Sequence, residues 1–188
     1  QYCEQTRQLI YDVSALSNNK ISVEVYDFVS DKDVVAKYGI DKIPAIVVEG
    51  QKDYGIRFYG IPAGYEFTSL IGTIMAVSSG RSNLSEETKS ALKQLKEPIH
   101  IQTFVTVTCP YCPKAVELSH RLAMESDLIT ADMVESSEFP HLVQKYNVMS
   151  VPKVIVNDKI EFEGALPEKE YVQNLMKILE PEVKDQSL

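Results

Sequence analysis

Two cysteines separated by two residues are the groups in this chain whose spacing could support chemistry. Cys109 and Cys112 follow an alternating apolar run over residues 99–107, and apolar side chains recur at three- and four-residue steps over residues 115–123. This pattern predicts a strand that ends just before the pair and a helix that begins at it. The first turn of a helix has unpaired N–H groups and the positive end of the helix dipole, and both favour a thiolate over a thiol. The pair therefore suits disulfide formation and thiol–disulfide exchange.

Cys109 is the predicted nucleophile because it comes first in the pair, lies closest to the exposed helix end and has no acidic neighbour. Its thiolate would attack a substrate disulfide, and Cys112 would resolve the mixed disulfide that forms. Pro110 suits an opening helical turn, since proline lacks an N–H that would have no partner there. Pro110 and Tyr111 would together tune the stability of the thiolate.

The composition is that of an ordinary globular protein long enough for one large domain or two small ones. The 188 residues are 44% hydrophobic and 24% charged, with a net charge of -8. This charge argues against nucleic acid or an anionic membrane as a partner. No apolar run approaches the roughly 18 residues of a membrane span. Three cysteines are too few for a disulfide-stapled secreted framework, so we expect a cytoplasmic protein whose cysteines do chemistry.

A Cys-x-x-Cys pair can also be half of a zinc site. Four ligands are needed, no second pair exists, and His100, His120 and His141 are scattered, so no metal is expected. His120 lies two turns past Cys112 and is expected to be a solvated or half-buried helix residue rather than the partner of a catalytic cysteine.

The same order of features occurs twice along the chain. The matched landmarks, 108 or 109 residues apart, are Tyr38 with Tyr146, Pro44 with Pro152, and Cys3 with Cys112. A polar stretch over residues 78–83 separates the two halves, which predicts units over residues 1–79 and 80–188. By the repeat, a strand and a cysteine are expected before Gln1, so the first unit is incomplete at its start. Cys3 is a catalytic candidate only with that partner; otherwise it is a lone thiol.

Periodicity predicts an α/β protein with a central mixed β-sheet flanked by helices. Predicted strands and hairpins cover residues 21–28, 44–60, 99–107, 128–134 and 153–164, and helices lie between them.

The order in the second half is strand, Cys-x-x-Cys helix, strand, helix, a hairpin that opens at a proline, and helix, which is the order of the thioredoxin fold. The chain resembles the glutaredoxin-like protein disulfide oxidoreductases of thermophilic bacteria and archaea, which have two thioredoxin-fold units in tandem. The stretches that carry the resemblance are Cys109-Pro110-Tyr111-Cys112, residues 146–153, residues 161–165 and residues 58–67.

The resemblance implies two tandem thioredoxin-fold units, the first lacking its N-terminal strand in this chain, that exchange dithiols with protein disulfides. It implies no cofactor beyond a redox-active Cys109–Cys112 disulfide, and a thioredoxin-reductase-type flavoprotein as electron donor. Pro152 would be cis and lie against the cysteine pair, and Val151 would offer its backbone to an extended substrate. Ile43 and Pro44 would do the same beside Cys3.

The chain departs from the thioredoxin pattern at the residue that serves as proton acceptor. Thioredoxins keep a buried aspartate six residues before the first cysteine, whereas this chain has Thr103 there. Any proton acceptor must come from elsewhere, and Glu66 is a candidate if it faces the pair of the second unit.

Three other functions compete with a general protein disulfide oxidoreductase. A glutathione-dependent glutaredoxin shares the Cys-Pro-Tyr-Cys pattern, but Glu161, Glu163 and Glu168 would repel a ligand with two carboxylates. A redox module that delivers electrons to a peroxiredoxin shares the Gly64-x-Glu66 and Val-Pro signatures, although Cys3 argues against it. A non-catalytic adaptor would have a broken second pair.

Overall fold

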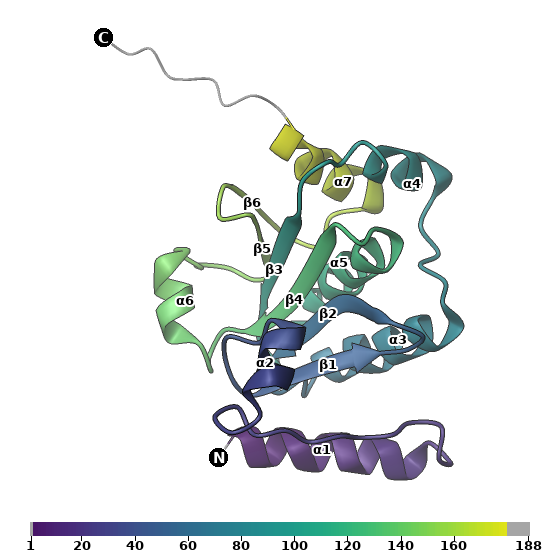
Figure 1. Cartoon of the computed structure of the whole chain (residues 1–188). Coiled ribbons are helices and arrows are strands. Elements are labelled where there is room, and N and C mark those ends of the chain that lie inside the picture. The colour runs from purple at the N-terminus through teal and green to yellow at the C-terminus, as the bar shows by residue number, and fades with distance from the viewer. Residues whose placement is uncertain (1, 180–188) are drawn as a thin grey trace.

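A six-stranded mixed β-sheet forms the centre of the computed structural model, which describes residues 2–179 (Figure 1). Gln1 and the end of the predicted second unit, residues 180–188, lie outside the described residues. The strands, in their order across the sheet, are β1 (Ala45–Glu49), β2 (Asp53–Tyr59), β4 (Ile129–Glu135), β3 (Ile99–Val105), β5 (Lys153–Val156) and β6 (Ile160–Glu163). β2, β4 and β3 are mutually parallel, and the remaining pairs are antiparallel.

Helices cover both faces of this α/β thioredoxin-like sheet. They are α1 (Tyr2–Leu16), α2 (Lys32–Tyr38), α3 (Glu66–Ser79), α4 (Glu86–Leu92), α5 (Cys112–Glu125), α6 (Pro140–Lys145), α7 (Glu168–Met176) and the 3-10 turn η1 (Lys177–Leu179). Neighbouring strand residues point to opposite faces, so Phe58 packs in the core below α3 and α5, whereas Tyr59 packs with Phe139 next to α6. No helix within residues 2–179 is long and apolar enough to cross a membrane.

His120 on α5 is fully buried, which corrects the expectation of a solvated or half-buried residue. Its Nδ1 lies 2.8 Å from Thr73 Oγ1 of α3, and its ring packs edge-on against Phe58. Burial lowers the pKa of His120 to about 3, so the ring is neutral at physiological pH. It is a packing residue between the two helices.

The prediction of a strand over residues 21–28 was wrong. Residues 21–27 have no strand pairing in the structure, and β1 is the edge strand of the sheet, paired only with β2. A strand is stabilised by hydrogen bonds to a neighbour, and no described segment lies paired beside residues 21–27. Val25 and Tyr26 are accordingly about half exposed rather than buried in a sheet.

The two proline loops have matching backbone arrangements. The peptide bonds Ile43–Pro44 and Val151–Pro152 are both cis, which confirms the prediction for Pro44 and Pro152. The N–H of Gly60 donates to the carbonyl of Pro44 at 3.0 Å, and that of Gly164 donates to the carbonyl of Pro152 at 2.8 Å. In both halves the hairpin therefore closes back on its proline in the same way.

A second pair of matched contacts lies before those loops. The hydroxyl of Tyr38 bonds Glu49 at 2.7 Å, and the hydroxyl of Tyr146, 108 residues later, bonds Asp158 at 2.5 Å. In each case the lysine that precedes the tyrosine lies 4.4 Å from the ring centroid. The halves thus repeat tertiary contacts as well as sequence landmarks.

A loop of the first half, residues 60–65, is fastened to the segment that leads into the cysteine pair. The N–H of Tyr65 donates to the carbonyl of Val107 at 3.0 Å, and that of Ile61 donates to Glu138 Oε1 at 2.7 Å. Gly64 has a φ of +59°, and a Cβ there would lie 2.2 Å from the Val107 carbonyl oxygen. Only glycine fits this approach.

Gly64→Ala is expected to lower the free energy of unfolding by about 3 kcal/mol or more, since backbone strain of roughly 1–2 kcal/mol is joined by a clash with backbone. The control is Gly80→Ala, where φ is +64° but a Cβ would meet nothing within 4 Å. Backbone strain alone should cost roughly 1–2 kcal/mol there. Urea unfolding of both variants measures the difference, and equal losses would contradict the close approach.

Candidate active site

β3 and α5 place the two cysteines at one turn. β3 ends at Val105 and α5 begins at Cys112, so Cys109 lies in the connecting loop and Cys112 is the first helical residue. The two form a disulfide with Cα atoms 5.5 Å apart. Cys109 is 8% exposed and Cys112 is fully buried. Cys112 is closed to solvent, and Cys109 is the cysteine of the pair that keeps some exposed surface, which fits the predicted order of nucleophile and resolving cysteine.

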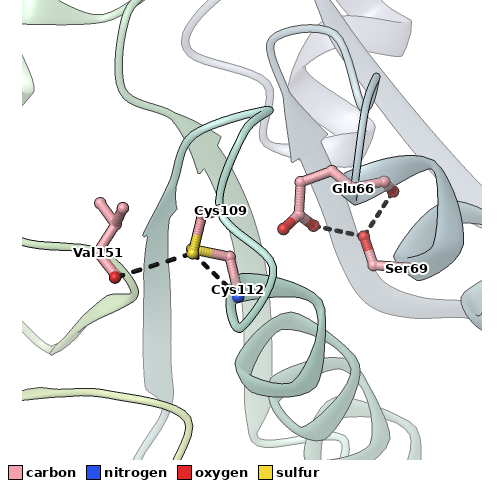
Figure 2. Close-up of a disulfide and its surroundings, with 5 residues drawn as sticks. All are labelled: Glu66, Ser69, Cys109, Cys112 and Val151. Carbon is pink, nitrogen blue, oxygen red and sulfur yellow. Dashed lines mark hydrogen bonds between the residues drawn. A yellow bond between two sulfur atoms is a disulfide. The ribbon is translucent and has the colours of Figure 1, made fainter.

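The start of α5 supplies a donor to the outer sulfur. The backbone N–H of Cys112 points to Cys109 Sγ with an N–S distance of 3.1 Å (Figure 2). In the reduced protein this N–H would bond a thiolate better than a thiol, and the helix dipole acts in the same sense. The local structure therefore favours an ionised Cys109.

The second proline loop lies directly against the disulfide. The carbonyl oxygen of Val151 is 3.8 Å from Cys109 Sγ (Figure 2), and the following Pro152 is buried. Pro110 and Tyr111, between the cysteines, are exposed, Tyr111 to 66%. An extended chain that reached Cys109 would meet the backbone of Val151.

The position of the thioredoxin aspartate is occupied by a hydroxyl network. Thr103 is fully buried, and its Oγ1 lies 2.8 Å from the Oγ of Ser119, which in turn lies 2.8 Å from the hydroxyl of Tyr171. Burial raises the pKa of Tyr171 above its ordinary value. These hydroxyls join β3, α5 and α7, and none of them is a carboxylate base.

A carboxylate of the first half points toward the cysteine segment instead (Figure 2). Glu66 begins α3, is fully buried, and extends its carboxylate toward the Cys109–Cys112 segment (Figure 2). Its Oε2 accepts a hydrogen bond from Ser69 at 2.5 Å, while Oε1 has no partner among the described residues. Burial raises the pKa of Glu66 to about 7 against the opposing effect of Ser69, and the charge of Glu117 adds to the rise. A group with this pKa can accept and return a proton near neutrality.

The residues predicted for a first-half site, Cys3, Ile43 and Pro44, include no cysteine pair like that of the second half. Cys3 is an exposed free thiol in the first turn of α1, Ile43 is half exposed, and Pro44 is buried. Because the disulfide joins Cys109 to Cys112, Cys3 has no cysteine partner among the described residues.

The hydrogen bond from Ser69 to Glu66 was not predicted from the sequence. Nor were the hydrogen bonds that hold residues 60–65 against Glu138 and Val107. Nothing in the local pattern identifies these contacts, because they join residues up to 77 positions apart. The available signal was Gly64 two residues before Glu66, a spacing that fits a close approach followed by a helix start.

A thioredoxin-domain family model matches residues 99–177, the half with the cysteine pair. The crystal structure of a protein disulfide oxidoreductase from Aeropyrum pernix k1 superposes with a TM-score of 0.87 at 34% identity, over 95% of this chain and 80% of that one. The chain belongs to the thioredoxin-fold disulfide oxidoreductases.

This disulfide oxidoreductase is also similar to a domain of an alkylhydroperoxide reductase. The NTD_N/C domain of alkylhydroperoxide reductase AhpF from Enterococcus faecalis (V583) superposes with a TM-score of 0.86 at 26% identity, over 93% of this chain and 84% of that one. A protein named NADH dehydrogenase from Ferdinandcohnia aciditolerans is 26% identical over 174 residues, 89% of this chain and 33% of its own length. The chain thus spans about a third or less of the curated relatives it matches.

Proposed function

We propose that this disulfide oxidoreductase catalyses thiol–disulfide exchange on protein disulfides through Cys109 and Cys112. The observation that carries the proposal is the Cys109–Cys112 disulfide at the start of α5, in which Cys112 is closed to solvent and the Val151 carbonyl oxygen lies 3.8 Å from Cys109 Sγ. That arrangement offers a nucleophile, a resolving thiol and a backbone edge for an extended substrate.

In the reductive direction, the Cys109 thiolate attacks a substrate sulfur. A Cys109–substrate bond forms, the substrate disulfide breaks, and the leaving sulfur takes a proton. Cys112 then gives its proton to Glu66 and attacks Cys109 Sγ, which closes the protein disulfide and releases the second substrate sulfur. The substrate gains two electrons and the dithiol loses two. Run backwards, the same steps oxidise or isomerise a substrate.

The test is insulin-disulfide reduction with dithiothreitol, where precipitation of the freed chains is followed by turbidity. Catalytic amounts of the protein should shorten the time to precipitation severalfold compared with dithiothreitol alone. A rate equal to that of dithiothreitol alone, with the protein folded, would rule out the proposed activity on this substrate class.

The similarity to the AhpF domain favours a second candidate, a redox module that passes electrons to a peroxiredoxin. The dithiol chemistry is the same, and only the acceptor differs. In that case the reduced protein would reduce an oxidised peroxiredoxin at least ten times faster than it reduces insulin. In either case, a thioredoxin-reductase-type flavoprotein is the proposed electron donor and the cytoplasm the proposed compartment, since the three cysteines form no disulfide framework.

We also propose that the chain contains two thioredoxin-like units, over residues 1–79 and 80–188. The support is the repeated cis-proline loops and the repeated Tyr38–Glu49 and Tyr146–Asp158 contacts. The parallel pairing of β2 with β4 would then join the two units through one sheet. Cys3, Ile43 and Pro44 would form the first-half counterpart of the Cys109 site.

A further inference from the structure

The two matched proline loops have side chains of different polarity at equivalent positions. By the 108-residue spacing, Met149 corresponds to Asp41, and Ser150 corresponds to Lys42. Asp41 forms an ion pair with Lys42, at 2.5 Å. Met149 is 83% exposed. The duplicated backbone therefore shows a charged group in the first half and an uncovered apolar one in the second.

Met149 belongs to the proline loop that contacts the disulfide. It is two residues before Val151, whose carbonyl oxygen is 3.8 Å from Cys109 Sγ. Two residues of chain span at most about 7 Å, so the backbone of Met149 cannot be far from that contact. A substrate segment laid along Val151 would pass this side chain.

The chain segments beside Cys109 hold no charged residue of their own, although the buried Glu66 extends toward the pair and Glu163 accepts a hydrogen bond from Ser150. These segments, residues 61–65, 106–113 and 148–152, hold 18 residues without an Asp, Glu, Lys, Arg or His, although 24% of the chain is charged. At that share, about four charged residues would be expected. Two further apolar rings are exposed there: Tyr111 to 66% and Tyr65 to 51%, the latter bonded through its N–H to Val107. These three segments therefore offer a substrate exposed rings but no charged side chain of their own for an ion pair.

We propose that Met149 is a specificity residue of the Cys109 site: it contacts an apolar side chain next to the half-cystine of an extended polypeptide substrate. The inference rests on the exchange activity proposed above and names the substrate class of that site. Methionine suits the role because its flexible thioether adapts to different apolar partners. Full burial of such a side chain corresponds to roughly a ten- to hundredfold gain in binding, and covering one side of it to about tenfold.

The test is a single-turnover exchange. The protein is reduced, freed of reductant, and mixed with one of two peptides whose cysteine is disulfide-linked to a small quencher thiol. The peptides differ only in having Leu or Ser beside that cysteine. Cys109 bonds to the peptide sulfur, the quencher leaves as a thiol, and the dithiol of the protein supplies both electrons. The rate of Cys109→Ser is subtracted as the contribution of Cys3.

Wild type should react about ten times faster with the Leu peptide than with the Ser peptide. Met149→Asp, which installs the first-half residue, should reduce that preference to about twofold or less, and Met149→Leu should keep it. Leu16→Asp is the matched control, since Leu16 is 84% exposed but lies at the end of α1. It should keep the tenfold preference.

Equal rate constants of wild type for the two peptides, or a tenfold preference that survives in Met149→Asp, would overturn the role of Met149 while exchange itself continues. Absence of exchange with both peptides and with hydroxyethyl disulfide would instead overturn the proposed function, and the inference with it.

Discussion

Cys109→Ser is expected to reduce insulin-disulfide reduction to the rate of dithiothreitol alone, a loss of the catalysed rate on the order of a thousandfold or more. Serine has no thiolate to form, and the N–H of Cys112 that lies 3.1 Å from the sulfur cannot ionise a hydroxyl at neutral pH. Because Cys112 is fully buried, it cannot replace Cys109 as the attacking group. Full activity in Cys109→Ser would contradict the mechanism.

Cys112→Ser should fail at a different step. Cys109 can still attack, so a mixed disulfide between protein and substrate should accumulate and be detected by mass spectrometry under non-reducing conditions. Cys109→Ser should trap no such species at this site. If the trapping pattern were reversed, the order of nucleophile and resolving cysteine would be wrong.

Cys3→Ser reports on the first half of the chain. If its rate falls together with that of Cys109→Ser, the first half contributes a second site. If only Cys109→Ser loses activity, the Cys109 pair carries the reaction. The comparison is informative because Cys3 is an exposed free thiol in this structure.

Local pattern was sufficient for the parts of the site that depend on neighbours in sequence. Alternation over residues 99–107 predicted β3, and three- and four-residue steps predicted α5, so the pair was placed at the turn between them. The start of α4 is local in the same sense, since the hydroxyl of Ser85 accepts from the N–H of Thr88 at 3.1 Å. These features need only a few adjacent residues to specify them.

The failure over residues 21–28 shows what periodicity leaves out. Alternation of apolar and polar residues indicates that one face can be buried, but a strand also needs a neighbour to pair with. The same alternation over residues 129–135 became β4, because β2 and β3 lie on either side of it. Residues 21–27 pair with no strand in the described chain.

The burial of Glu66 and His120 could not be predicted from the neighbouring residues in the sequence either. Glu66 is a helix-start acid, and such residues are usually solvated. It is buried here because the loop over residues 60–65 docks on Val107 and brings the start of α3 against the cysteine segment. His120 is buried for a related reason, since α3 packs on α5 and Thr73 lies 2.8 Å from the ring. Both outcomes depend on contacts between the two halves, which no single stretch encodes.

Glu66→Gln is expected to stabilise the protein above neutral pH. The pKa of Glu66 in the folded protein, about 7, lies above the ordinary value of 4.5. Below about pH 4.5 the carboxyl is protonated in both folded and unfolded chains, so the variant should match wild type. Between about pH 4.5 and 7 the unfolded chain ionises at this position while the buried carboxyl of the folded protein stays protonated. The free energy of unfolding of wild type should therefore fall by about 3 kcal/mol relative to the variant over this range and level off above pH 7.

The measurement is urea unfolding of the oxidised proteins across this range. Glu87→Gln is the control, because Glu87 is exposed on α4 and its substitution should change stability by about 0.5 kcal/mol or less at any pH. A constant difference between Glu66→Gln and wild type from pH 4.5 to 8 would show that Glu66 does not titrate as its burial implies.

The same substitution should slow catalysis. Without a base near neutrality, Cys112 must lose its proton to water, and resolution of the mixed disulfide should slow by about a hundredfold at pH 7, the lower end of general-base effects. At alkaline pH hydroxide can take the proton in place of the missing base, so the two rates should converge. Rapid-mixing measurements from pH 5 to 10 should show an inflection near 7 in the rate of resolution for wild type only.

A merely structural defect in Glu66→Gln would lower both the stability and the rate. Greater stability with a slower, pH-shifted resolution step identifies Glu66 as the proton acceptor, and superimposable pH profiles would exclude it.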